Sequence, residues 1–192
     1  MTLESRLSDF GQHTDKSYCH QYLHLYEALC EPLRARAQKV LEIGVYRGGS
    51  LTMWRNYFWN AHITGVDINP APPSLSGLDR LSVLTGDAYS DPMIGQLEEL
   101  GPFDLIVDDG PHTLESQVVA AARYSSLVAR GGLLLIEDIA NPDWVQQIAR
   151  AVPVELQQYT YAIDRRWIPG KANSPDNEII FVLDLRYVQE DI

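Results

Sequence analysis

A short apolar segment that runs into a glycine-rich turn limits most strongly what this chain can fold into. Residues 39–51 read Lys-Val-Leu-Glu-Ile-Gly-Val-Tyr-Arg-Gly-Gly-Ser-Leu. The apolar half is typical of a buried parallel strand, and the glycines are typical of a ligand-binding loop. Gly44 lets the backbone leave the strand sharply, and Ser50 is expected to cap a following helix. The segment predicts a strand, a binding loop and a helix.

The glycine spacing limits which ligand the loop can hold. Gly44 and Gly48 are four residues apart, with Glu42 just before them, which fits neither the lysine-ending phosphate loop nor the G-x-G-x-x-G dinucleotide loop. Downstream, residues 63–69 read as a second strand that ends in Asp67. Open α/β folds place an acid there to accept hydrogen bonds from ribose hydroxyls. A nucleoside-containing ligand is therefore predicted.

Strand-like and helix-like patterns alternate along most of the chain. Further strands are expected at residues 81–84, 103–108 and 133–136, and a helix from Leu114 to Val128 that Gly131 and Gly132 stop. This alternation predicts a doubly wound α/β fold with a mostly parallel sheet. Residues 154–163 and 178–185 are strand-like and predict a closing antiparallel pair.

Length and composition predict one soluble domain. The 192 residues show no internal repeat, so we expect a single domain, 1–192, with an N-terminal helical cap (1–35) and a Rossmann-like core (36–192). The cap contains a helical pattern from Thr14 to Leu33. No apolar run is long enough to span a membrane, and no secretory signal is visible, so a cytoplasmic location is expected.

Charge and cysteine content exclude further classes. Fifteen basic and 26 acidic residues give a net charge of −11, which repels nucleic-acid phosphates and makes nucleic acid an unfavourable partner. Cys19 and Cys30 show no metal-binding spacing, so buried free thiols are expected.

At this point four motifs together resemble the class I S-adenosylmethionine-dependent methyltransferases. They are Glu42-Ile-Gly44, Asp67 at the end of the second strand, Gly86-Asp87-Ala88 after the third, and Asp108-Asp109-Gly110 after the fourth. The resemblance covers roughly residues 14 to 140 of the chain. It implies S-adenosylmethionine as cofactor. The implied cofactor-binding residues are Glu42, Gly44, Tyr46, Gly48, Ser50, Asp67, Ile68, Gly86, Asp87, Ala88, Asp108 and Tyr18. Asp87 could instead only stabilise a turn.

Acids also gather after the fourth and fifth strands. Asp108 and Asp109 follow one strand, and Glu137 and Asp138 follow the next. Neighbouring parallel strands bring their carboxyl ends together, and converging carboxylates repel one another unless a cation lies between them. Mg²⁺ prefers such oxygen ligands. His112 could then reach a substrate hydroxyl held on that metal.

The resemblance narrows here to the macrocin and mycinamicin type of sugar O-methyltransferase. It implies Asp109, Glu137 and Asp138 as metal ligands and His112 as the general base. Pro111 replaces a serine common in that family, and a proline suits a first helical position. The segment around Tyr18 resembles one that lies over the cofactor, although helical spacing alone would make Tyr18 and Tyr22 core aromatics.

The leading hypothesis is therefore an Mg²⁺-dependent O-methyltransferase that acts on a hydroxyl of a small molecule, such as a sugar or glycosylated natural product. Two alternatives stay open: an NAD-dependent oxidoreductase with Asp67 on the ribose, and a methyltransferase-like binding module whose acids are structural. The resemblance also allows a homo-oligomer. Acceptor choice is expected to depend on the N-terminal segment, residues 70–77 and residues 159–177.

Overall fold

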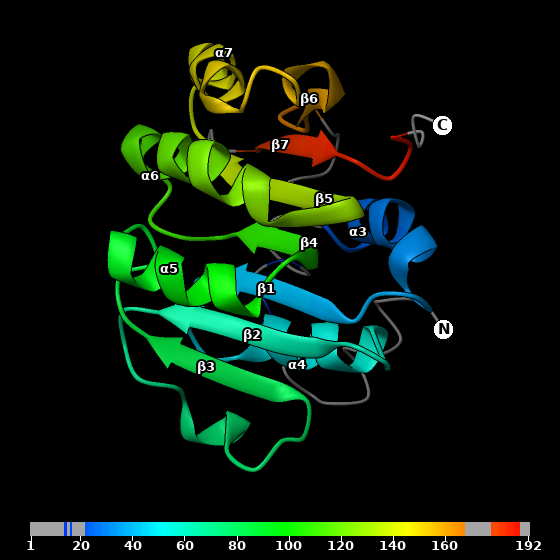
Figure 1. Cartoon of the computed structure of the whole chain (residues 1–192), viewed down its shortest axis with the longest axis vertical. Coiled ribbons are helices and arrows are strands. Elements are labelled where there is room, and N and C mark those ends of the chain that lie inside the picture. Colours follow the sequence, from blue (N-terminus) through cyan, green and yellow to red (C-terminus); the bar gives the residue numbers. More distant parts are fainter. Residues whose placement is uncertain (1–13, 15, 17–21, 168–177, 189–192) are drawn as a thin grey trace.

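The computed structural model describes residues 14, 16, 22–167 and 178–188, and a seven-stranded sheet forms its centre (Figure 1). Strands β1 to β5 are mutually parallel, whereas β7 is antiparallel to both of its neighbours. The predicted doubly wound sheet with an antiparallel C-terminal strand is confirmed. In sheet order, the strands are β3 (Leu81–Thr85), β2 (His62–Asp67), β1 (Lys39–Ile43), β4 (Phe103–Asp108), β5 (Val128–Ile139), β7 (Ile179–Asp184) and β6 (Thr160–Asp164).

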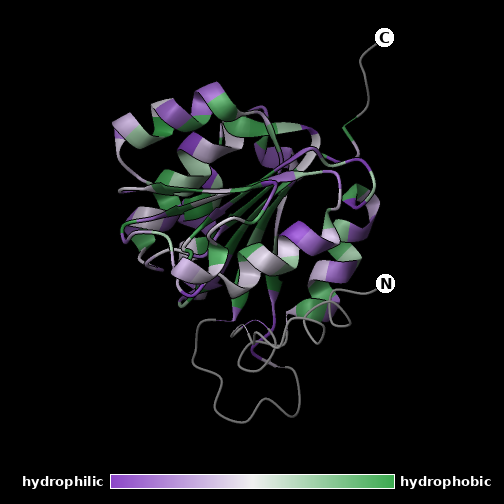
Figure 2. Cartoon of the chain, turned by 90° about the horizontal axis from the view of Figure 1, so that it is seen from below, coloured by the Kyte–Doolittle hydropathy of each residue, from purple (hydrophilic) through white to green (hydrophobic). Residues whose placement is uncertain are grey.

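Helices cover both faces of the sheet and form two separate cores. Side chains alternate along each strand, so Val40 joins one core and its neighbour Leu41 joins the other. Figure 2 shows hydrophobic residues concentrated along the strands. The first core includes α3 (Leu23–Cys30) and α4 (Gly49–Tyr57); the second includes α5 (Asp91–Leu100), α6 (Leu114–Val119) and α7 (Pro142–Ala151).

The chain changes direction across the sheet between β1 and β4. From β1 it continues through β2 and β3 on one side, then crosses to β4 and β5 on the other side (Figure 1). The loops that follow β1 and β4 therefore separate from each other, and in open α/β sheets this point leaves a crevice for a ligand. Ile43 and Asp108, the last residues of these strands, are paired in register.

Three element boundaries differ from the sequence expectation. The helix expected from Leu114 to Val128 stays helical to Leu127, but only α6 (Leu114–Val119) is α-helical, and a π-helical segment (Ala120–Tyr124) and a 3-10 turn (Ser125–Leu127) complete it. The β5 strand then begins at Val128 and passes through the two glycines that were expected to stop a helix. Gly131 has φ +80° at a register irregularity of this strand, so it accommodates a bulge and stops no helix.

The other two differences concern local hydrogen bonding and capping. The expected strand from Val154 begins only at Thr160, because the preceding residues form turns, and the side chain of Gln157 donates to the carbonyl of Val152. Ser50 lies within α4 and does not cap it; the cap is Gly48, in the left-handed conformation with φ +80°. A glycine makes that conformation at little cost.

The N-terminal expectations are only partly within the described residues. Helix α3 covers the second half of the predicted helix, and Cys30 is a buried free thiol, as expected. Burial raises the pKa of this thiol to about 12. Cys19 lies outside the described residues, and the division into a cap and a core stays a prediction. Within the described ranges, no helix has the length and apolar character needed to cross a bilayer.

Candidate functional site

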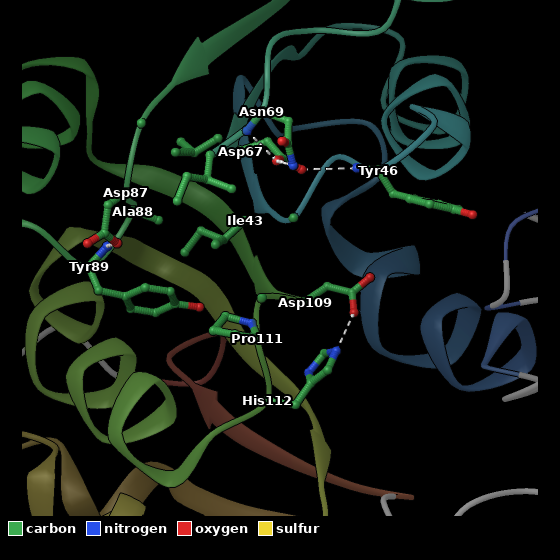
Figure 3. A pocket seen from close by; sticks show the side chains of 15 residues that line it. Ile43, Tyr46, Asp67, Asn69, Asp87, Ala88, Tyr89, Asp109, Pro111 and His112 are labelled. Atoms are coloured by element: carbon green, nitrogen blue, oxygen red, sulfur yellow. Dashed lines mark hydrogen bonds and ion pairs between the residues drawn. The ribbon is translucent and has the colours of Figure 1, made fainter.

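A pocket of about 480 Å³ opens where β1, β2, β3 and β4 end (Figure 3). Its walls are mixed: Ile43, Val66 and Ala88 are apolar, whereas Asp67 and Asp87 carry carboxylates. An apolar slot with a few fixed polar groups is the usual form of a small-molecule site. Of the residues implied as cofactor-binding, the pocket is lined by Gly44, Tyr46, Asp67, Ile68, Gly86, Asp87 and Ala88.

Gly44 brings the glycine loop against the end of β4. It has φ +88°, and its N–H donates to the carbonyl of Val66 (2.9 Å). The Asp109 N–H donates to the Ile43 carbonyl (2.9 Å), which holds the two strand exits together. A Cβ atom on Gly44 would collide with the backbone carbonyl of Asp109. Only glycine combines this close approach with a positive φ at low cost.

Asp67 fixes the conformation of the loop from the end of β2. Its Oδ2 accepts hydrogen bonds from the N–H groups of Val45 (2.8 Å) and Tyr46 (3.1 Å), and its Oδ1 accepts from the N–H of Asn69 (2.8 Å). Burial alone would raise the pKa of Asp67, but these hydrogen bonds hold it below its usual value. Asp67 is therefore a stable anion that shapes one wall of the pocket.

The opposite wall comes from the turn after β3. Asp87 lines the pocket and also accepts from the N–H of Tyr89 (2.9 Å), so it both faces the cavity and stabilises its own turn. The Tyr89 hydroxyl donates to Oδ1 of Asp108 (2.5 Å). Burial raises the pKa of Asp108 to about 7, although the Tyr89 hydrogen bond opposes the shift. Asp108 does not line the pocket; Tyr89 does.

One end of the pocket is formed by Asp109 and His112, which follow β4. Nε2 of His112 lies 3.7 Å from Oδ1 of Asp109 and 3.8 Å from Oδ2 of Asp138. Asp109, His112 and Asp138 each offer a ligand atom, and these atoms lie within 4.8 Å of one another. His112 has φ +56° and Asp138 has φ +55°, values that are uncommon for non-glycine residues and that recur at functional sites. The three side chains have the spacing of a metal site.

Pro111 is not at the position expected for it. The sequence suggested a first helical residue, but Thr113 is the N-cap of α6, and its hydroxyl accepts from the N–H of Ser116 (3.1 Å). Pro111 and His112 therefore lie in the loop before the helix, and both line the pocket. This cap fixes the first residue of α6 and therefore the length of the loop that carries His112.

A local irregularity turns two consecutive acids of β5 toward the same face. The pairing of β5 with β7 shifts between Ile136 and Ile139, which is where Glu137 and Asp138 lie. The Tyr22 hydroxyl donates to Oδ1 of Asp138 (2.7 Å), and the Tyr26 hydroxyl donates to Oε1 of Glu137. These tyrosines are one helical turn apart, so both acids face the N-terminal helix. A regular strand would point them to opposite faces.

The sequence interpretation missed Lys16, which lies among these acids. Its Nζ is 2.5 Å from Oδ2 of Asp109, 2.7 Å from Oε2 of Glu137 and 3.6 Å from Oε1 of Glu42. The residue is only 1% exposed. Burial alone would lower the pKa of Lys16, but the three carboxylates raise it well above its usual value. No spacing rule would have identified it, because its partners lie 93 and 121 residues away in the chain.

Glu42 is the most deeply buried of the predicted cofactor residues. It is fully buried, and neither carboxylate oxygen has a hydrogen-bond partner among the described residues. Burial raises the pKa of Glu42 to about 7, while the Lys16 ammonium opposes the shift. Buried carboxylate oxygens without a hydrogen-bond partner are costly, although the Lys16 ammonium 3.6 Å from Oε1 offsets part of that cost here.

The remaining predicted residues divide into three groups. Tyr46 and Ile68 line the pocket and are largely exposed, at 78% and 73%. Gly48 and Ser50 shape the start of α4 and do not line the pocket. Tyr18 lies outside the described residues. Tyr22 is fully buried and contacts Asp138 as well, so it is both a core aromatic and a neighbour of the acids.

The residues present fit a nucleoside cofactor and a divalent cation. The pocket combines an anion at the end of β2, an apolar floor and the glycine loop, which is how doubly wound folds hold a nucleoside. The adjoining carboxylates are hard oxygen ligands that suit Mg²⁺ or Mn²⁺, and the His112 imidazole lies beside them. Asp109 and His112 belong to both regions, so the two regions are continuous.

Sequence comparison finds curated relatives that act on sugars of natural products. The chain is 36% identical over 142 residues to 8-demethyl-8-alpha-L-rhamnosyl tetracenomycin-C 2'-O-methyltransferase of Streptomyces olivaceus, covering 68% of this chain and 36% of that protein. It is 31% identical over 174 residues to mycinamicin VI 2''-O-methyltransferase of Micromonospora griseorubida, covering 81% and 43% respectively. The chain thus spans less than half of each relative's length. No protein-family model matches it.

Structural comparison also finds methyltransferases. The chain resembles the MycE methyltransferase from the mycinamycin biosynthetic pathway, solved in complex with Mg, SAH and mycinamycin VI. The TM-score is 0.66 at 28% identity, over 77% of this chain and 39% of that one. A caffeoyl-CoA O-methyltransferase-like structure from Staphylococcus aureus shares the fold at 15% identity and a TM-score of 0.60.

Proposed function

We propose that this chain, which belongs to the class I S-adenosylmethionine-dependent methyltransferases, transfers a methyl group to a hydroxyl of a small molecule. The proposed reaction depends on Mg²⁺. The observation that carries the proposal is the continuity of the nucleoside-type pocket with the acid and histidine cluster, through Asp109 and His112. A methyl donor and a metal-held acceptor could meet there. Methyl transfer depends mainly on such alignment of donor and acceptor.

The names of two relatives support a proposal for the acceptor class. They specify a rhamnosyl tetracenomycin and mycinamicin VI, both glycosylated natural products. We therefore propose a sugar hydroxyl of a glycosylated natural product as the acceptor. The net charge of −11 disfavours nucleic acid as an acceptor. We also propose that the protein acts in the cytoplasm, without a membrane partner, and that it can form a homo-oligomer.

Two regions of the pocket would bind the cofactor. Asp67 would accept hydrogen bonds from the ribose hydroxyls, and the apolar surfaces of Ile68 and Ala88 would lie against the base. Glu42, Gly44, Tyr46, Gly48, Ser50, Gly86, Asp87, Asp108 and Tyr18 complete the proposed binding set. Several of these act indirectly: Asp108 through Tyr89, and Gly48 and Ser50 through the start of α4.

His112 would act as the general base. A sugar hydroxyl is a poor nucleophile at neutral pH, and a bound divalent cation supplies acidification and orientation of such a hydroxyl. Asp109, Glu137 and Asp138 would hold that cation. His112 lines the pocket with its Nε2 beside Asp109 and Asp138, so it could take the proton from a hydroxyl held there.

Cofactor binding tests the proposal. We expect calorimetry to show binding of S-adenosylhomocysteine, and we expect Gly44→Val and Asp67→Ala to abolish or greatly weaken it. Gly95→Ala is the matched control, because a Cβ atom at Gly95 in α5 would meet nothing within 4 Å. Unchanged affinity in both site variants would contradict the proposal. A thermal-shift response to NADH in place of S-adenosylhomocysteine would favour an oxidoreductase.

A binding module without catalysis is the remaining alternative. It predicts that the cofactor binds but that alanine at Asp109 and Glu137 changes neither turnover nor any phenotype. Methyl transfer from labelled S-adenosylmethionine to a glycosylated acceptor, lost in Asp109→Ala, would exclude it.

A further inference from the structure

Lys16 lies at the place where a cation would bridge two proposed metal ligands. Its Nζ contacts Oδ2 of Asp109 (2.5 Å) and Oε2 of Glu137 (2.7 Å), and Oε1 of Glu42 is 3.6 Å away. At 1% exposure, the ammonium is shielded from water on all sides by protein. The hydrogen bonds that it donates to Asp109 and Glu137 are charge-assisted and therefore strong.

The ammonium offsets much of the repulsion in this cluster. Glu42, Asp109, Glu137 and Asp138 are close together, and three of them are almost fully buried. Like charges this near to one another repel strongly at the effective dielectric of a protein. Lys16 thus allows the acids to stay together when no metal is bound.

Lys16 also contacts a carboxylate oxygen that a metal would need. Oε2 of Glu137 contacts Lys16, and Oε1 accepts from the Tyr26 hydroxyl, so both carboxylate oxygens are engaged. The three residues with metal-ligand spacing are Asp109, His112 and Asp138, and Glu137 is not one of them. A divalent cation held by Asp109, Glu137 and Asp138 together would meet the ammonium at the same carboxylate oxygens.

We propose that Lys16 competes with the divalent cation for Asp109 and Glu137. Metal binding by all three acids displaces the Lys16 ammonium, and removal of the ammonium favours the metal. Lys16 is in this view a positioning residue that sets metal affinity and holds the acids in place before the metal arrives. The inference rests on the metal site of the proposed methyltransferase.

Metal affinity gives the first test. With Mn²⁺ as probe, we expect calorimetry to show about tenfold or tighter binding to Lys16→Met than to the wild type, because a unit charge near a cation interacts strongly even at a surface-like dielectric. Lys39→Met is the matched control: it removes the same charge from an exposed position on β1 and should bind as the wild type does. Equal or weaker binding by Lys16→Met would overturn the proposal.

Lysine labelling of the wild type gives the second test and needs no variant. The chain has three lysines, so mass spectrometry can follow acetylation of Lys16 relative to the exposed Lys39. Saturation with Mn²⁺ should raise the Lys16 signal several-fold. An unchanged ratio at metal saturation would overturn the proposal even if Lys16→Met failed to fold.

The same preparations separate this inference from the proposed function. S-adenosylhomocysteine affinity, measured on each protein, reports on the cofactor pocket alone. Mn²⁺ binding to the wild type without tightening in Lys16→Met would reject only the role of Lys16. Absence of Mn²⁺ binding in both proteins would reject the metal site and the inference together.

Discussion

The α-carbon of Gly44 lies so close to the backbone carbonyl of Asp109 that no side chain fits between them. This contact joins the exit of β1 to the exit of β4, the two strands between which the pocket opens. The cofactor loop and the proposed metal ligand therefore share one backbone arrangement. A change at either residue should affect both regions.

Gly44→Ala tests this contact. We expect it to destabilise the protein by about 2 kcal/mol or more, because the added Cβ clashes with backbone and the residue keeps a left-handed φ. Gly95→Ala in α5 should instead stabilise it by about 1 kcal/mol, since that site is open and helical. Urea unfolding of both variants measures the difference. The idea fails if Gly44→Ala is as stable as the wild type.

Asp67 should make stability depend on pH in a defined direction. Its pKa in the folded protein lies below the usual value, because the N–H groups of Asn69, Val45 and Tyr46 favour the anion despite burial. The stabilisation is therefore complete at neutral pH and is lost as the pH falls below about 4 and through the folded-state pKa. We expect the stability difference between wild type and Asp67→Asn to shrink over that range in thermal unfolding. A difference that stays constant with pH would contradict this assignment.

His112→Ala should separate proton transfer from binding. Turnover should fall by about 10²-fold or more for a lost general base, while Mn²⁺ and S-adenosylhomocysteine affinities stay at their wild-type values. His24→Ala, on the exposed side of α3, is the control and should keep full turnover. Loss of Mn²⁺ binding in His112→Ala would instead make the imidazole a metal ligand, as its spacing to Asp109 and Asp138 permits.

Metal removal should reproduce the effect of losing Asp109. We expect excess EDTA to abolish methyl transfer by the wild type, and added Mg²⁺ to restore it. Asp109→Ala should be inactive with or without chelator, and EDTA should leave S-adenosylhomocysteine binding largely intact. Turnover assays on an accepted glycoside measure this. Full activity in excess EDTA would return Asp109, Glu137 and Asp138 to structural roles.

The fold could be predicted because its signals are local. Each of the first four strands is a short apolar run, and the acids at strand ends, such as Asp67 and Asp109, follow directly from strand order. The pocket residues near Gly44 and Asp87 were predicted for the same reason. Local details were less predictable: the change of helix type after Val119 and the length of β5 depend on packing and on a bulge at Gly131.

The features of the site that could not be predicted from the sequence are contacts between segments that lie far apart in the chain. Lys16 reaches acids more than ninety residues away, and Tyr22 and Tyr26 look like core aromatics until their hydroxyls are placed. Tyr89 was missed because its role depends on the orientation of Asp108, which periodicity does not encode. In each case the role of the side chain depends on a partner in another secondary-structure element.

The irregularity in β5 makes the acid pair sensitive to chain length as well as to residue type. Glu137 and Asp138 reach the same face only because the pairing with β7 slips between Ile136 and Ile139. Deleting a residue next to the pair, such as Ile139, would allow the pairing to return to plain alternation and would send one carboxylate to the opposite side of the sheet. The pair would then be separated although both acids were still present. The arrangement of the two carboxylates thus depends partly on the number of residues in β5. Inspection of residue types alone would not detect the loss of that arrangement.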